Sequence, residues 1–240
     1  MTARVARSAG IILALLALDY LLLVGIGLLL TKVLEKSSLI HKEDAINRGL
    51  ADGRTPRMND VTYLLSGLGN TGAIIGALIV VAVSLVIAMK KWAPSIFLVV
   101  AVSGQALVFL LVTLTISRQR PDVKRLDASP PTSSFPSGHT GAATALFIGS
   151  ALLVLWYVQR TWVKVVGMTL LIAVPLLVAY GRLYRGMHHP TDVLAAYLNG
   201  GICVAIAAGV ILARGPLHRF AQGGGVEHDP QRAPVTTGAR

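Results

Sequence analysis

The chain alternates long stretches that carry no charged residue with short polar connections. Five stretches have no Asp, Glu, Lys or Arg: Val61–Met89, Trp92–Ser117, Thr140–Gln159, Val165–Gly181 and Val193–Ala213. A sixth, Gly10–Leu30, is interrupted only by Asp19. Because about 20 apolar residues in a helix cross the hydrocarbon core of a bilayer, we predict six membrane-spanning helices, the fifth being the shortest.

Composition places the whole chain in the membrane class. Hydrophobic residues make up 54% and charged residues 14% of the 240 residues, and the mean hydropathy is +0.66. These values lie outside the range of ordinary soluble domains. No small-residue cleavage site follows the first apolar stretch, so it is predicted as a helix and not as a signal peptide. The fold class we expect is all-α, an integral membrane bundle of six helices.

The net charge of +11 changes the expected partner and not the fold. In a soluble protein it would suggest nucleic acid, but here the basic residues lie at membrane boundaries. Anionic lipid and phosphate headgroups are therefore the expected partners, and no nucleic acid is expected. The single cysteine, Cys203, excludes a disulfide within the chain and a cysteine-built zinc site.

Alternating six helices sorts the connections onto two sides. The segment between the first two helices, the Pro-containing link Asp122–Phe135 and the turn Arg182–Thr191 fall on one side, and both termini fall on the other. Lys and Arg number ten on the terminal side and twelve on the other. Six of those twelve surround the polar motifs described below, and the other six lie in Lys32–Arg57 among acidic residues. We discount them as site and loop residues and predict cytoplasmic termini.

The same pattern predicts three regions. Residues 1–60 form the first helix and an extracytoplasmic loop, residues 61–213 form a core of five helices, and residues 214–240 form a Gly- and Pro-containing disordered tail. Within the loop, Ser37–Asp60 fits a short interfacial helix and a solvated loop equally well. Asp19, in the middle of the first span, is either a tolerated residue or a polar contact to another helix.

Polar residues recur at the ends of the predicted helices. Arg120-Pro121 follows the third helix, and Thr113 would lie two turns below Arg120 on the same face. Ser137-Gly138-His139 opens the fourth helix after Pro136, where free backbone N–H groups favour an anion. Arg182 closes the fifth helix, and His188 precedes the sixth. The spacing of His188 and Asp192 would let the carboxylate accept the imidazole N–H.

Together these groups suit a tetrahedral oxyanion. Two guanidinium groups and a helix N-terminus can surround it, while one imidazole is held by Asp192 and a second comes from His139. This inventory fits phosphoryl transfer through a histidine nucleophile and a histidine acid. A lone boundary arginine or histidine would instead be a headgroup contact or a cap, and for Arg118, Arg125 and Arg185 the headgroup or solvent interpretation is preferred.

Arg120-Pro121, Pro136-Ser137-Gly138-His139 and Arg182-x5-His188-x3-Asp192 resemble the three signature motifs of the type 2 phosphatidic acid phosphatase superfamily. These are membrane lipid phosphatases related to vanadium-dependent haloperoxidases, and the similarity spans about Val61 to Ala213. The resemblance implies that His188 attacks phosphorus, His139 protonates the leaving oxygen and Asp192 orients His188. It assigns the phosphate oxygens to Arg120, Arg182 and the Ser137-Gly138 backbone, and it implies that no metal or other cofactor is required.

The chain departs from the family pattern at two positions. The family usually has lysine seven positions before the motif arginine, where this chain has Thr113, and Arg118 or Lys124 could supply the missing charge. The family also tends to have serine where this chain has Gly181. His189 lacks the motif spacings, so it is predicted to be a spectator.

The function implied is a phosphatase of the cell membrane that hydrolyses a lipid phosphate or diphosphate, with the active site at the non-cytoplasmic helix ends. An isoprenoid diphosphate is the favoured substrate, and phosphatidic acid and phosphatidylglycerol phosphate stay open. A lipid phosphotransferase would share every catalytic residue. In a transporter of anions or protons, the same polar residues would be spread through the depth of the membrane. Their position at one end of the helices favours the enzyme.

Overall fold

In the computed structural model, residues 2–128 and 132–213 are described, and every secondary-structure element within them is helical. The elements are α1 (Thr2–Leu28), η1 (Leu29–Val33), α2 (Ser38–Asp52), α3 (Pro56–Gly67), α4 (Thr71–Met89), α5 (Ala93–Thr115), α6 (Gly138–Ala143), η2 (Thr144–Ile148), α7 (Gly149–Tyr157), α8 (Thr161–Tyr184), α9 (Pro190–Ala207) and η3 (Ala208–Ala213). Six helical stretches in the described part of the chain are long and apolar enough to cross a membrane. The predicted all-α membrane bundle is confirmed.

The second span is shorter than predicted. The uncharged stretch Val61–Met89 does not form one helix, because α3 ends at Gly67 and α4 begins at Thr71. The turn between them is closed by hydrogen bonds from Gly69 N–H to the Ser66 carbonyl and from Asn70 N–H to the Gly67 carbonyl, each 3.0 Å. Glycine has a low helix propensity and asparagine favours helix starts, which explains why the helix breaks here. The prediction missed the break because it followed only the absence of charged residues.

The fifth span is longer than predicted. It is α8, which has 24 residues, whereas α4 has 19, so the expectation that the fifth helix is the shortest is wrong. The charged residues Lys164 and Arg182 lie inside the first and last turns of α8. A boundary drawn at charged residues therefore cut a turn from each end.

The centre of the bundle is formed by α5 and α9, and α4 lies at its edge. Only 6% of the α4 span is buried inside the protein, against 56% of the α9 span. The outer helix α1 packs onto the centre through Leu16 and Leu23, which join Val108 and Val112 of α5 in one cluster of buried side chains. The described core thus fixes α5, which precedes Arg120, and α9, which begins just after His188 and carries Asp192.

Asp19 of α1 is buried in this packing. Its side chain is 2% exposed, and the Cys203 thiol on α9 donates to its Oδ2 at 3.7 Å. The polar contact to another helix, one of the two alternatives for this residue, is therefore present.

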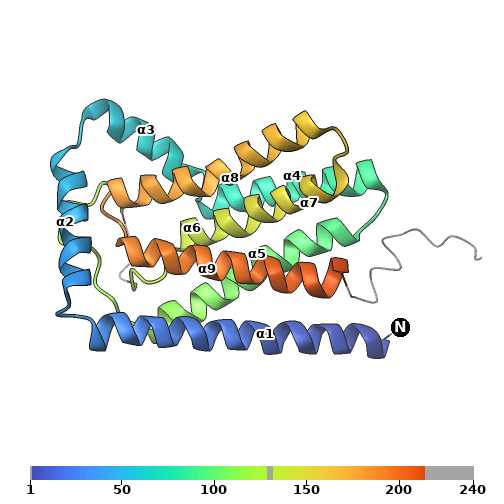
Figure 1. Ribbon diagram of the computed structural model, residues 1–240, viewed down its shortest axis with the longest axis horizontal. Coiled ribbons are helices and arrows are strands. Elements are labelled where there is room, and N and C mark those ends of the chain that lie inside the picture. Colours follow the sequence, from blue (N-terminus) through green and yellow to red (C-terminus); the bar gives the residue numbers. More distant parts are fainter. Residues whose placement is uncertain (1, 129–131, 214–240) are drawn as a thin grey trace, which may run out of the picture.

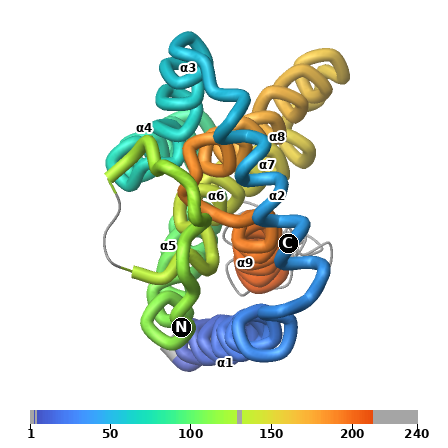
Figure 2. Tube along the Cα trace, turned by 90° about the vertical axis from the view of Figure 1, so that its left-hand side faces the viewer, coloured from blue at the N-terminus to red at the C-terminus, as the bar shows by residue number. Residues whose placement is uncertain are grey.

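A helix covers one end of the bundle. The segment Ser38–Asp52, for which helix and loop were equal alternatives, is helix α2. Figure 1 shows α2 running across the ends of the spanning helices, and Figure 2, viewed from that end, shows it passing from α1 to α3 in front of them. Its chain then turns into α3, where the Thr55 hydroxyl accepts from Met58 N–H at 3.3 Å and Pro56 opens the helix.

The three motifs lie at the end that α2 covers. In Figure 1 the link from α5 to α6 and the turn from α8 to α9 are at this end, and the start of α1 is at the other. The predicted disordered tail, residues 214–240, lies outside the described residues.

Candidate active site

His188 occupies the turn before α9 and faces a cavity of about 700 Å³. Its Nδ1 is 2.7 Å from the Ser134 carbonyl oxygen. Because a carbonyl only accepts, Nδ1 carries the ring proton and Nε2 is the basic nitrogen. Burial lowers the pKa of His188, while Asp192 opposes the shift. A neutral imidazole with a basic Nε2 is the form that can act as a nucleophile.

Asp192 contacts His188 differently from the prediction. Its Oδ2 is 3.8 Å from His188 Nδ1, too long for a hydrogen bond, and accepts instead from the backbone N–H of His189 at 2.8 Å. Because α9 begins at Pro190, His188 lies before the helix, and the two side chains do not share a helical face. Asp192 therefore holds the peptide that follows His188, and the Ser134 carbonyl holds the ring.

His139, in the first turn of α6, lines the same cavity as His188. Its Nε2 lies 2.7 Å from the Asn70 Oδ1, and Asn70 precedes α4. The contact joins the turn between α3 and α4 to the site. Sequence reasoning missed Asn70, although an asparagine in the short Gly67–Gly72 segment of an otherwise apolar stretch was a signal that the helix breaks there.

The start of α6 presents Gly138 to the cavity and keeps Ser137 out of it. Ser137 is fully buried; its backbone N–H donates to the Asp192 carbonyl at 3.1 Å, and its hydroxyl is 3.0 Å from the Thr140 hydroxyl. The predicted phosphate contact through the Ser137 N–H is therefore not available. Gly138 lines the cavity, and a Cβ there would meet the Phe109 ring at 2.8 Å. Glycine is needed for this close approach.

The two predicted phosphate-binding arginines meet at this cavity. Arg182, in the last turn of α8, donates to the Ser66 hydroxyl at 2.8 Å and to Asp127 at 3.0 Å. Arg120 donates to the Met187 carbonyl at 2.6 Å, and its buried Nε has no partner among the described atoms. Burial lowers the pKa of Arg120, and the charge of Asp192 opposes this. Both arginines line this cavity, which we call the histidine cavity because His139 and His188 also line it.

Arg120 does not lie on a helix. We predicted that it ends the third helix two turns above Thr113, but α5 ends at Thr115 and the chain is extended at Ile116. Thr113 lines neither the histidine cavity nor the second, polar cavity described below. The threonine at the family's lysine position is thus not among the residues that line the candidate site.

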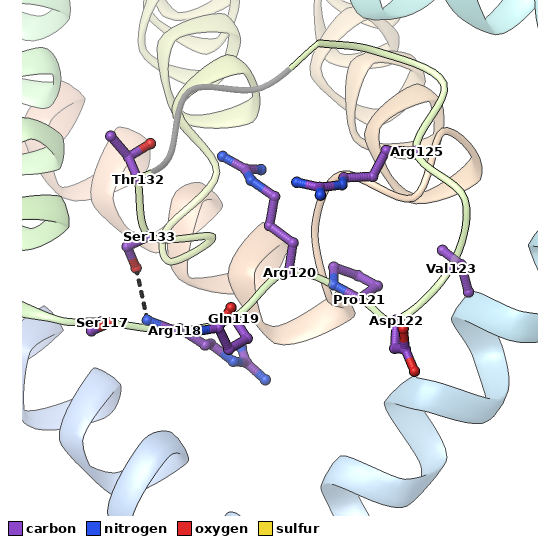
Figure 3. Close-up of a pocket in the computed structure, with 10 residues that line it drawn as sticks. All are labelled: Ser117, Arg118, Gln119, Arg120, Pro121, Asp122, Val123, Arg125, Thr132 and Ser133. Carbon is purple, nitrogen blue, oxygen red and sulfur yellow. Dashed lines mark hydrogen bonds between the residues drawn. The ribbon is translucent and has the colours of Figure 1, made fainter.

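A second, polar cavity of about 610 Å³ adjoins Arg120. Figure 3 shows the Arg120 and Arg125 side chains extending into it from two parts of the same loop, while Arg118 points to the opposite side of the chain. Arg120, Thr132 and Ser133 line both cavities. Arg120 therefore separates a polar chamber from the histidine cavity.

Two arginines that were expected to face headgroups or water are buried instead. Arg185 is 5% exposed and donates to both oxygens of Asp127. Arg118 is 9% exposed and pairs with Asp192 at 2.5 Å and with Glu43 at 2.7 Å. As an accessory phosphate ligand Arg118 is thus already occupied, and the other accessory candidate, Lys124, is exposed and lines neither cavity.

Asp127 was missed by sequence reasoning, yet it lines the histidine cavity. Burial favours its neutral form, but hydrogen bonds from Arg185 and the charges of Arg182 and Arg185 hold the pKa of Asp127 below its usual range. It is therefore an anion that neutralises Arg182 at neutral pH. Nothing in the local sequence distinguishes it from the other acidic loop residues.

The histidine cavity continues into an apolar groove. Its further lining comes from Ile75 and Leu78 of α4 and from Val102, Ala106 and Phe109 of α5. The groove thus joins the polar end of the site to the edge of the bundle, where α4 lies. Among residues 2–128 and 132–213, no three His, Cys, Asp or Glu side chains are grouped so that they could hold a metal ion.

Gly181, where the family tends to have serine, lies against the backbone of α3. A Cβ at this position would be 3.1 Å from Ser66 N and 3.2 Å from the Thr62 carbonyl oxygen. The Ser66 hydroxyl on α3 accepts a hydrogen bond from Arg182, the residue that follows Gly181. Close packing of α3 and α8 thus explains the glycine.

Replacing Gly181 with serine should therefore destabilise the protein. We expect Gly181→Ser to lower the free energy of unfolding by about 1–3 kcal/mol, because overpacking moves α3. Thermal unfolding of the purified protein in detergent measures the change. Gly201→Ser is the matched control, since a Cβ at Gly201 meets nothing within 4 Å. Equal stability of the two variants would contradict the packing argument.

Comparison with known proteins identifies related sequences. A family model described as the PAP2 superfamily matches residues 93–216. An undecaprenyl-diphosphatase of Sulfolobus acidocaldarius is 31% identical over 97 residues, which cover 40% of this chain and 42% of that protein. A phosphatidylglycerophosphatase B of Bacillus subtilis is 26% identical over 175 residues, which cover 72% of this chain and 85% of that protein.

Solved structures share the fold. The crystal structure described as the first transmembrane PAP2 type phosphatidylglycerolphosphate phosphatase, from Bacillus subtilis, has a TM-score of 0.67 at 21% identity and covers 81% of this chain and 92% of that one. The crystal structure of Aquifex aeolicus LpxE has a TM-score of 0.55 at 24% identity and covers 69% of this chain and 93% of that one. The arrangement of helices is common to all three proteins.

Proposed function

The chain belongs to the PAP2 superfamily, and on this basis we propose that it is a membrane-embedded hydrolase of lipid phosphates. One observation supports this proposal above the others. His188, with Nε2 as its basic nitrogen, shares a cavity with His139 and two arginines, and that cavity continues into an apolar groove. A phosphate at the polar end would have its lipid chain in the groove.

The reaction we propose has two steps. His188 Nε2 attacks phosphorus, the bond from phosphorus to the leaving oxygen breaks, and His139 gives that oxygen a proton. The phosphohistidine then reacts with water, which gives a proton to His139 as the P–N bond breaks. Arg120, Arg182 and the Gly138 N–H stabilise the charge on the phosphoryl oxygens. For Arg182 to do so, the phosphate must take over the contact that Asp127 makes.

We favour an isoprenoid diphosphate as the substrate. The apolar groove between α4 and α5 suits a long hydrocarbon chain, and the relative with 31% identity is an undecaprenyl-diphosphatase. Phosphatidylglycerol phosphate is the second candidate, because the Bacillus subtilis relative is a phosphatidylglycerophosphatase. Phosphatidic acid is the third.

A substrate panel tests this proposal. Purified protein in detergent is given an isoprenoid diphosphate, phosphatidylglycerol phosphate and phosphatidic acid, each with and without a chelator. We expect phosphate release that is fastest with the diphosphate and insensitive to the chelator. Release that stops with the chelator would contradict the metal-independent mechanism. A lipid alcohol added as acceptor distinguishes a phosphotransferase, which would form a new lipid phosphate in place of free phosphate.

The pH dependence follows from the environment of His188. Burial lowers its pKa from the ordinary value of 6.5, and only neutral His188 can attack. We therefore expect a bell-shaped profile of kcat/KM in which the acid limb, the decline toward low pH, lies below pH 6.5. Steady-state rates between pH 4 and pH 9, at about one-unit steps, measure this. A decline that begins above pH 7, or a flat profile, would contradict the assignment.

We also propose that the site opens to the extracytoplasmic side and that the N-terminus is cytoplasmic. The short connections at the end opposite the site carry Lys90, Lys91 and Arg160, and Lys164 lies in the first turn of α8 beside them, as expected for the cytoplasmic side. With Cys203 replaced by alanine, a membrane-impermeant thiol reagent should label Lys124→Cys on intact cells and leave Lys90→Cys unlabelled. The reverse labelling would invert the orientation.

A further inference from the structure

Helix α2 contributes a buried carboxylate next to the candidate site. Glu43 is 2% exposed, and both its oxygens are used: Oε1 accepts from the Thr191 backbone N–H and Oε2 from Arg118, each at 2.7 Å. A buried carboxylate is tolerated when its partners are provided in this way. One turn further along α2, Asn47 is 1% exposed and its Nδ2 lies 3.3 Å from His189 Nδ1. The buried face of α2 is therefore directed at the start of α9.

Arg118 links this carboxylate to Asp192. One of its terminal nitrogens, NH2, donates to Glu43, and the other, NH1, donates to Asp192 Oδ1 at 2.5 Å. Lysine, with a single ammonium group, cannot hold two carboxylates in this planar arrangement. The other oxygen of Asp192 holds the His189 N–H at 2.8 Å. The chain of contacts thus runs from α2 through Arg118 and Asp192 to the peptide that follows His188.

We propose that Glu43 and Arg118 are positioning residues, which fix Asp192 and the start of α9 and thereby set the place and the proton affinity of His188. The inference rests on the proposed function of His188. Glu43 lies outside residues 93–216, which the family model matches. Through Glu43, the proposal gives α2, for which helix and loop were equal alternatives, a part in supporting the reaction.

Neither residue lines the histidine cavity, so the pair should act on the rate of the chemical step and not on substrate binding. Glu43 and the Arg118 guanidinium are absent from the lining of the histidine cavity. Loss of either should lower kcat about tenfold or more, because small displacements of reacting groups are costly. KM should stay within about twofold, because the groups that bind the phosphate and the lipid are unchanged.

The charges of the pair have opposite effects on His188. Arg118 reduces the negative charge that Asp192 presents to the ring, and Glu43 reduces the positive charge of Arg118. The other titratable groups that act on His188 or Asp192 stay in place in these variants: Arg120, Arg182, His139 and His189, with Asp44 at 3.9 Å from His189 and Asp127 on Arg182. Removing Arg118 should make His188 easier to protonate, and removing Glu43 should make it harder.

The test compares pH profiles of kcat/KM for Glu43→Gln and Arg118→Gln. We expect the acid limb to move to higher pH in Arg118→Gln and to lower pH in Glu43→Gln, each by about half a unit or more. Arg118→Lys keeps the charge but not the two-sided contact, so it should lower kcat with a smaller shift of the limb. The control is Asp52→Asn, which changes an exposed acid on α2, the helix that carries Glu43. This variant should match the wild type in kcat and in the position of the acid limb.

A purely structural role gives a different result. Variants that lose activity only through misfolding would show acid limbs that do not move, or that move in the same direction. Any such movement would be in proportion to the thermal stability that each variant loses. If a single variant does not fold, Glu43→Gln/Arg118→Gln removes both charges of the pair and leaves Asp192 without the contact from Arg118. This double variant should show a lower kcat with its acid limb slightly above that of the wild type. A kcat within twofold of the wild type, or an unmoved limb in the variants that fold, would overturn the proposal. Loss of activity in His188→Ala would stand in either case, so this failure is distinct from failure of the proposed function.

Discussion

Replacing His188 with alanine should lower kcat for lipid phosphate hydrolysis by at least about 10⁴-fold, the scale of loss when a nucleophile is removed. His188 lines the histidine cavity, and the Ser134 carbonyl, 2.7 Å from Nδ1, leaves Nε2 as the basic nitrogen that can attack. Phosphate release from purified variants in detergent measures the effect.

The neighbouring histidine provides the comparison for this variant. The His189 ring contacts Asn47 and the Gln119 carbonyl, each at 3.3 Å, and does not line the histidine cavity. His189→Ala should therefore retain kcat to within about tenfold. If His189→Ala abolished activity and His188→Ala retained it, the assignment of the nucleophile would be wrong.

The second large effect is expected for His139→Ala. Loss of the general acid should lower kcat by about 10²–10⁴-fold on a substrate whose leaving group is an alkoxide. The loss should be smaller on a diphosphate, because a phosphate leaving group needs less help from a proton. Parallel rates on phosphatidic acid and on an isoprenoid diphosphate measure the difference.

Asn70 offers a graded control for His139. Its Oδ1 lies 2.7 Å from His139 Nε2, so Asn70→Ala removes the orienting contact and leaves the acid. We expect a smaller loss than in His139→Ala, with the same dependence on the leaving group. An equal loss on both substrates in His139→Ala would count against its role as the acid.

The sequence predicted the features that repeat along the chain. Long apolar stretches fix the helices because the bilayer excludes unpaired backbone groups, and helix alternation brought His139 and His188 to one end. The break at Gly67–Asn70 was hidden because it carries no charge. Arg120 was misplaced because nothing in the sequence indicated that α5 ends at Thr115, before the proline.

The interactions that hold the site were not predictable in this way. Glu43, Arg118 and Asp192 are separated by about 75 residues at each step, and their pairing depends on how α2 crosses the bundle. Taken alone, Arg118 looks like an ordinary boundary arginine, and burial is what reveals its role. The same holds for Arg185 and Asp127, which pair across 58 residues.

The central claim is that the phosphoryl group passes through His188, and it can be tested by isolating the intermediate. Protein mixed with a lipid phosphate labelled in its terminal phosphoryl group is quenched in base, digested and sequenced by mass spectrometry. The account predicts phosphate on His188, a label that acid removes, and no labelled peptide from His188→Ala. A wild-type protein that turns over the substrate while its label appears on another residue, or on none at any quench time, would contradict it.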